Sequence, residues 1–132
     1  MVKWAGRIIV FLGLLHLVTT ALPNLGHVPS WLAGELWFPR HGIAELTPAT
    51  GAFWLTLGSF AVPLSLVGAL VLAMDRRGVV PPAFTGWTVG LWGTAGALLL
   101  EPSPFIVVWV PAAMLITAAR RTARTPETAP AA

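Results

Sequence analysis

Four long apolar stretches constrain the fold of this chain more than any other feature. They run from Trp4 to Leu22, from Pro48 to Met74, from Ala83 to Leu100 and from Phe105 to Ala119. A helix needs roughly 20 mostly apolar residues to cross a bilayer, with about 17 as a lower limit. The fourth stretch reaches only about 22 Å as a helix, so it needs interfacial flanks or a thin local bilayer. We therefore predict an all-α fold, in which four membrane-spanning helices form a bundle.

The composition excludes several other classes of protein. Only 10% of the 132 residues are charged and 56% are hydrophobic, whereas a soluble domain carries about 25% charged residues. An ordinary soluble enzyme and a disordered chain are therefore excluded. The net charge of +3 is not clustered as in nucleic-acid binders, so no nucleic-acid partner is expected. The absence of cysteine removes disulfides, thiolate catalysis and Cys-ligated zinc.

The basic residues predict the orientation of the chain. Seven of the eight fall on one side of the predicted membrane, namely Lys3, Arg7, Arg76, Arg77, Arg120, Arg121 and Arg124. The positive-inside rule then places both termini in the cytoplasm. We expect residues 1–121 to form the membrane domain and residues 122–132 to form a disordered cytoplasmic tail.

The long loop between the first two predicted helices is extracytoplasmic in this orientation. Residues 23–50 contain four prolines, which divide the loop into short pieces. Ser30 is expected to cap a short interfacial helix that extends to Phe38. Thr47 followed by Pro48 predicts the start of the second membrane helix. Further prolines at positions 63 and 111 are expected to kink the second and fourth helices.

A stripe of small residues predicts close helix packing. Gly86, Gly90, Gly93 and Ala97 share one face of the third predicted helix, and small residues let membrane helices approach closely. The contact could lie inside the bundle or join two copies, so a homo-oligomer through Gly86 and Gly90 is possible. The same periodicity turns His16 and Glu101 inward.

Ionisable side chains collect on the extracytoplasmic side and suggest acid/base chemistry. Burial at the rim of an apolar cavity favours the neutral form of a carboxyl group. We expect Glu101 to act as the acid, Glu35 or Glu45 as its partner, and His16 as a base or hydrogen-bond donor. The predicted substrate-binding residues are Arg40, His41, Trp37, Trp54 and Trp109.

These residues predict a cofactor-independent isomerase or cyclase that acts on a lipophilic, terpenoid-like or polyketide-like substrate. Membrane lipids and this lipophilic small molecule are the expected partners. The histidines lack the spacing of a metal motif, so no metal site is predicted. Alternatively, the carboxylates are solvated and His16 only bonds to a neighbouring helix. The chain is then a non-catalytic binder or carrier of a hydrophobic molecule, or an accessory subunit of a larger membrane complex.

Several motifs also resemble those of a known family. They are Trp4-x-Gly6-Arg7, Gly13-x-x-His16, Phe53-Trp54, Arg76-Arg77-Gly78 with Pro81 or Pro82, and Gly86-Trp87. Together they resemble a family of small bacterial four-helix membrane proteins that is catalogued as a domain of unknown function. The resemblance implies a four-helix fold and a location in the bacterial inner membrane, but it implies no chemistry. The last helix of that family typically opens with Pro-x-Ser-Gly-Phe-Trp, from which Pro102-Ser103-Pro104-Phe105 departs, and Glu101 stands where an apolar residue is common.

Overall fold

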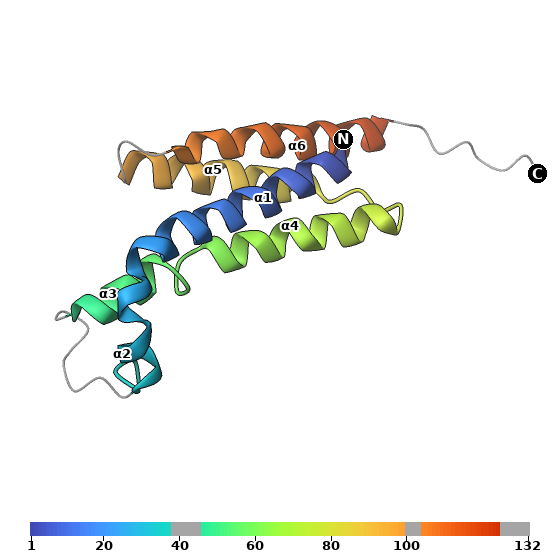
Figure 1. The fold of residues 1–132 in the computed structure, drawn as a ribbon. Coiled ribbons are helices and arrows are strands. Elements are labelled where there is room, and N and C mark those ends of the chain that lie inside the picture. The colour runs from blue at the N-terminus through green and yellow to red at the C-terminus, as the bar shows by residue number, and fades with distance from the viewer. Residues whose placement is uncertain (38–45, 100–103, 125–132) are drawn as a thin grey trace, which may run out of the picture. The chain divides into compact units, whose positions relative to one another are not determined.

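The computed structural model describes residues 1–37, 46–99 and 104–124, and this part of the chain is helical without any strand (Figure 1). The α-helices and the two 3-10 helices, η1 and η2, follow one another as α1 (Val2–Ala21), η1 (Leu22–His27), α2 (Val28–Leu32), α3 (Pro48–Leu55), α4 (Ala61–Arg76), α5 (Ala83–Leu99), η2 (Pro104–Val108) and α6 (Trp109–Arg124). The prediction of an all-α fold is confirmed.

The described residues form two compact units. Unit 1 contains residues 1–9 together with the part of the chain from Val67 onward, and unit 2 contains Val10–Leu66. Helices α1 and α4 are each divided between the two units, α1 after Ile9 and α4 after Leu66. The packing of each unit is therefore described by itself.

Two of the predicted helices have nearly the expected bounds. α1 and α5 begin and end within two residues of the predicted positions. The fourth predicted helix begins as η2, continues as α6 and reaches Arg124, so residues 122–124 are helical and not part of a disordered tail. Residues 125–132 lie outside the described part.

The second apolar stretch is not the single helix that the sequence predicts. It forms α3 and α4, which are separated by residues 56–60. The Thr56 hydroxyl donates to the carbonyls of Ala52 (2.8 Å) and Phe53 (3.2 Å), and the Ser59 hydroxyl donates to the Thr56 carbonyl (2.5 Å). These bonds lie at the end of α3, where the backbone of the C-cap residue Thr56 leaves the helical conformation, with φ of −107° and ψ of −98°. Hydropathy could not reveal the break, because Leu57 and Phe60 within it remain apolar.

Both internal prolines lie in the first turn of an α-helix. α4 begins two residues before Pro63, and α6 begins two residues before Pro111. A proline is tolerated there because the first N–H groups of a helix have no intrahelical acceptor.

The two predicted caps have different outcomes. Thr47 is the N-cap of α3, where its side chain accepts a hydrogen bond from the Thr50 amide at 3.2 Å, as predicted. The prediction for Ser30 is wrong, because α2 begins at Val28 with His27 as its N-cap residue and places Ser30 inside the helix. The 3-10 helix η1 ends at His27 and continues directly into α2, so α2 begins before Ser30.

Glycines set the packing of α5 against η2 and α6 in unit 1. A Cβ atom at Gly86 would lie 2.6 Å from the Ala112 carbonyl oxygen, and one at Gly90 would lie 2.8 Å from the Trp109 ring. At Gly93 it would lie 3.2 Å from the Phe105 carbonyl. The predicted small-residue stripe therefore faces the following helical segment of the same chain. A homo-oligomer through Gly86 and Gly90 stays a prediction.

The remaining core of unit 1 is small and apolar. Near the start of α1, a Cβ atom at Gly6 would lie 2.8 Å from the Leu72 side chain and 3.1 Å from the Gly68 carbonyl, so α1 and α4 also approach closely. The buried hydrophobic residues of this unit are Val2, Ala5, Ile9, Val71, Val89, Val108, Ala112, Leu115, Ile116 and Ala118.

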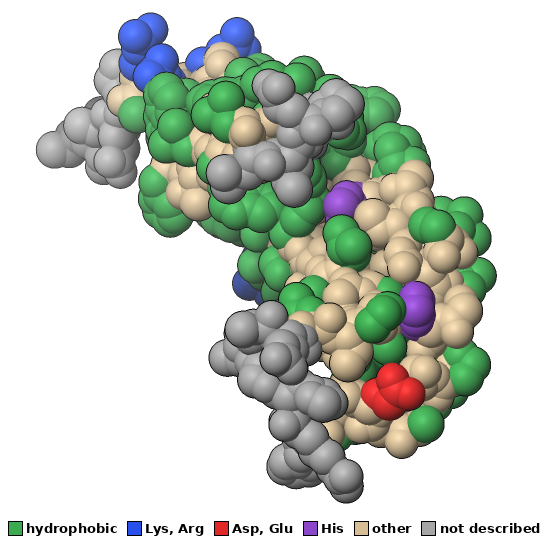
Figure 2. Space-filling model, turned by 90° about the vertical axis from the view of Figure 1, so that its left-hand side faces the viewer, with side chains coloured by type: hydrophobic (Ala, Val, Ile, Leu, Met, Phe, Trp, Pro, Cys, Tyr) green, Lys and Arg blue, Asp and Glu red, His purple; other side chains and the backbone are tan. Residues whose placement is uncertain are grey.

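Many large hydrophobic side chains lie on the surface instead. On α1, Phe11 is 61% exposed and Val18 is 53% exposed, and on α5 Leu91 is 59% exposed. Figure 2 shows a face where the hydrophobic side chains of the described residues are abundant. In the described part of the chain, many large apolar side chains are therefore left exposed.

Two helical stretches of the described residues are long and apolar enough to cross a membrane. They are Val2–Leu32 and Pro104–Arg124, and only 11% and 28% of their most apolar windows are buried inside the protein. The core helix of a soluble protein would instead be mostly buried. By length and composition the two stretches are therefore compatible with membrane-spanning helices.

Gly86 provides a direct test of the α5–α6 contact. We expect Gly86→Ala to destabilise the protein by about 1–3 kcal/mol, because the added methyl group meets the backbone of α6. Gly51→Ala is the matched control: no atom lies within 4 Å of its added Cβ, so it should be neutral or stabilising by up to about 1 kcal/mol. Thermal unfolding in a mild detergent measures both. Equal stability of the two variants would contradict the assigned contact.

Candidate functional site

The structure describes five of the nine predicted site residues. Glu35, His16, Trp37, Trp54 and Trp109 are described. The other four, which include the proposed acid, lie outside the described residues, and they are Arg40, His41, Glu45 and Glu101. The proposed carboxylate pair therefore stays a prediction.

His16 lies on α1 in unit 2 and is half-buried. Its ring is stacked at a tilt of 40° on Phe60, with 4.3 Å between the ring centroids. A hydrogen bond joins the imidazole to the backbone of Leu55 at the end of α3. These contacts attach α1 to the α3–α4 connection, which agrees with the alternative that His16 bonds to a neighbouring helix. Its role as a base stays a prediction.

The polar groups that follow His16 bond to the backbone of their own helical segment. The hydroxyls of Thr19 and Thr20 donate to the His16 carbonyl at 3.0 and 2.8 Å. The Asn24 amide donates to the Thr20 carbonyl at 2.8 Å. Polar groups satisfied in this way are tolerated in an apolar environment.

An aromatic cluster holds α2 against α3 in the same unit. The indole N–H of Trp31 donates to the Ala49 carbonyl at 2.8 Å. The Trp31 ring meets Phe53 edge to face at 6.1 Å, and Phe53 meets Trp54 in the same way at 5.5 Å. Trp54 is 57% exposed beside this cluster. We name Trp31, Phe53 and Trp54 the aromatic cluster of unit 2.

Glu35 and Trp37 follow α2 in a turn and are both exposed. The Glu35 amide donates to the Ser30 carbonyl at 3.2 Å, and the Trp37 amide donates to the Gly34 carbonyl at 3.0 Å. Gly34 has a φ of 93°, a left-handed conformation that glycine adopts without steric cost. The turn presents the Glu35 carboxylate at the surface.

Trp109 belongs to unit 1, where it packs over Gly90. Its indole N–H donates to the Thr94 hydroxyl at 2.8 Å, and that hydroxyl donates to the Gly90 carbonyl at 3.1 Å. The Trp87 ring meets Trp109 edge to face at 5.9 Å. These contacts fix α6 on α5, and a role of Trp109 in substrate binding stays a prediction.

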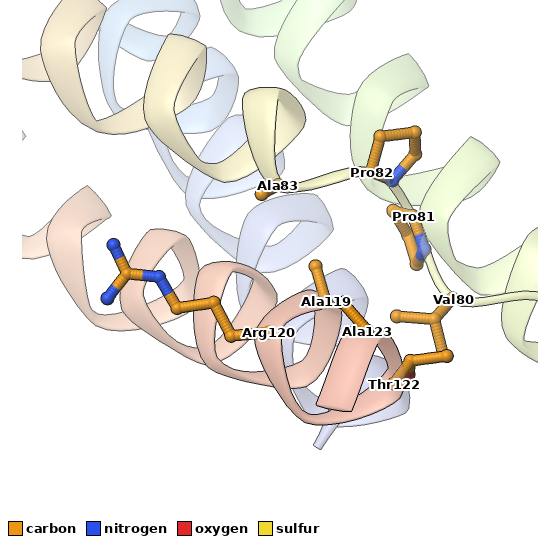
Figure 3. A pocket seen from close by; sticks show the side chains of 8 residues that line it. All are labelled: Val80, Pro81, Pro82, Ala83, Ala119, Arg120, Thr122 and Ala123. Atoms are coloured by element: carbon orange, nitrogen blue, oxygen red, sulfur yellow. The ribbon is translucent and has the colours of Figure 1, made fainter. Parts of the chain in front are cut away.

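The sequence analysis missed a pocket in unit 1. It has a volume of about 410 Å³ and lies between the α4–α5 connection and the last turns of α6 (Figure 3). Its lining residues are Val80, Pro81, Pro82, Ala83, Ala119, Arg120, Thr122 and Ala123. In the sequence, the available sign of this pocket was the Pro81-Pro82 pair, which follows two arginines and precedes a helix. The sequence does not show that this pair lies beside the last turns of α6.

Metal ligands do not cluster in the described part of the chain. No group of three or more His, Cys, Asp or Glu residues there could hold a metal ion.

Comparison with known proteins gives no further assignment. No model of a known family, no curated protein and no solved structure matches the chain.

Trp31 tests whether the aromatic cluster fixes α2 on α3. Trp31→Phe keeps a ring against Phe53 but removes the hydrogen bond to Ala49, which should cost about 0.5–1.5 kcal/mol. Hydrogen exchange of the α2 and α3 amides measures the effect. Trp37→Phe is the control, because Trp37 is 72% exposed and should change exchange little. If both variants exchange alike, the Trp31 bond does not hold these helices together.

Proposed function

We propose that the chain is an integral protein of a bacterial inner membrane that crosses the bilayer four times. The observation that carries the proposal is the large exposed apolar surface of the helices. Contact of these side chains with lipid chains has no hydrophobic cost, whereas their contact with water is unfavourable. The motifs quoted above support membership in the uncharacterised four-helix family, which is part of the same proposal.

The distribution of charge supports an orientation with both termini in the cytoplasm. All seven cationic residues of the described part belong to unit 1, in the first two turns of α1, at the end of α4 and at the end of α6. These three helix ends lie at the same end of unit 1 (Figure 1). Asp75 is the acidic residue among the described residues of that unit. Such an excess of Lys and Arg favours the cytoplasmic side.

We further propose that the opposite side acts on a lipophilic small molecule by acid/base catalysis without a cofactor. An ionisable residue inside a membrane helix is costly and therefore suggests function. His16 is such a residue, and its imidazole lies beside Phe60. In the proposed isomerase or cyclase reaction, Glu101 donates a proton to the substrate. Glu35, Glu45 or His16 removes a proton at another carbon, so that the proton count is unchanged.

One observation favours the binder as a second candidate function. The contacts of His16 with Phe60 and Leu55 already give it a packing role, and the neighbouring aromatic cluster ends in the exposed Trp54. Aromatic side chains with one exposed face are suited to hold a hydrophobic molecule. If the chain is a binder, substitution of Glu35, Glu45 or Glu101 by Gln should leave the binding of the hydrophobic molecule unchanged.

The topology is tested with reporter fusions and membrane extraction. Two reporters are fused at each position, one that is active only in the cytoplasm and one that is active only in the periplasm. After Ala132 only the cytoplasmic reporter should be active, and in the loop at residues 40–45 only the periplasmic reporter should be active. The protein should stay in the membrane pellet at alkaline pH. A periplasmic reporter at Ala132 would contradict the even number of crossings, and release into the supernatant would contradict membrane insertion.

The chemistry is tested on the purified protein with extracted bacterial lipids as the substrate mixture. Mass spectrometry should detect an isomeric or cyclised product, and Glu101→Gln should lower its formation at least 100-fold, the usual contribution of a general acid. Glu127→Gln, in the C-terminal tail, is the matched control. An unchanged molecule that copurifies with both variants would support the binder and contradict the enzyme.

A further inference from the structure

One wall of the pocket in unit 1, the α4–α5 connection, has a restricted backbone. The Gly78 amide donates to the Asp75 carbonyl and the Val79 amide to the Met74 carbonyl, both at 3.0 Å. With Gly78 at a φ of 70°, these two bonds form a Schellman motif that ends α4. Pro81 and Pro82 then restrict the backbone up to the start of α5, and Pro81 is fully buried. The backbone of this wall is therefore fixed by local hydrogen bonds and by the two proline rings.

The interior of the pocket is suited to hydrocarbon. Most of its lining consists of the side chains of Val80, the two prolines and three alanines. The Thr122 hydroxyl donates to the Ala118 carbonyl of its own helix at 3.2 Å, so it has a partner without a ligand. An apolar group that enters the pocket displaces water from apolar walls, which is favourable.

The edge of the pocket is suited to a negative charge. The Arg120 side chain runs along α6 away from Pro81 and Pro82 (Figure 3), so its stem borders the apolar space and its guanidinium lies at the side. Six further cationic residues belong to the same end of the unit. Basic pockets between membrane helices on the cytoplasmic side bind anionic lipid head groups.

We propose that this pocket binds one anionic phospholipid, with part of an acyl chain against the prolines and its phosphodiester beside Arg120. The inference rests on the proposed membrane location, because the pocket then lies at the level of the cytoplasmic head groups. A phospholipid supplies both groups that the pocket can recognise. A free phosphate would use the arginine only, and a zwitterionic lipid would place a cation among cations.

Native mass spectrometry of the full chain in a neutral detergent tests the proposal. The protein is titrated with phosphatidylglycerol or phosphatidylcholine, and one phosphatidylglycerol should be retained preferentially. Arg120→Gln should weaken its binding about fivefold, since one cation near an anionic surface contributes about 1 kcal/mol. Ala123→Trp should reduce binding at least as much by filling the pocket, and Ala123 is exposed, so the fold should tolerate the change.

Arg7→Gln is the matched control, because Arg7 lies at the same end but stacks on Trp4, 5.0 Å from the ring centroid. It should leave the binding of phosphatidylglycerol nearly unchanged. An equal loss with Arg7→Gln and Arg120→Gln, or equal retention of both lipids, would overturn the proposal. So would displacement of the lipid by millimolar inorganic phosphate. A protein that leaves the membrane at alkaline pH contradicts the proposed function, whereas one that stays but shows no lipid preference contradicts this inference alone.

Discussion

Close approach of helix backbones at glycine is the interaction on which unit 1 depends. Gly86 brings α5 against the Ala112 carbonyl of α6, and Gly6 brings α1 against the Gly68 carbonyl of α4. In the proposed membrane location, helices would gain little by hiding apolar side chains from their surroundings, because acyl chains are equally apolar. Dispersion contacts at short distance then provide the attraction. A small core of mostly Ala, Val, Leu and Ile is sufficient under these conditions, whereas it would be poor for a soluble protein of this length.

The sequence predicted the helices that local periodicity defines. α1 and α5 lie close to the predicted bounds, and the stripe through Gly86 packs on the next helical segment. The break between α3 and α4 was missed, because the backbone leaves the helical conformation at Thr56 within a stretch whose residues stay mostly apolar. A helix search by apolar length cannot detect such a change of backbone conformation.

The candidate site was less predictable than the fold for a related reason. His16 and Trp109 were both predicted as site residues, and they belong to different units, which are described separately. The first packs on Phe60 and the second over Gly90. The position of a residue along the sequence does not show which helix its side chain contacts. The pocket beside Arg120 was missed for the same reason, since its walls are about 40 residues apart in the sequence and meet only through the α5–α6 hairpin.

Hydroxyl and indole groups have separate roles in this chain. The hydroxyls of Thr20, Thr94 and Thr117 each donate to the carbonyl four residues earlier in their own helix, so they require no partner from another helix. Two indoles instead connect different elements, Trp31 to Ala49 and Trp109 to the Thr94 hydroxyl. A hydrogen bond is directional, so these two bonds restrict the rotation of one element on the other. Glycine therefore sets how closely the helices approach, and tryptophan sets their register.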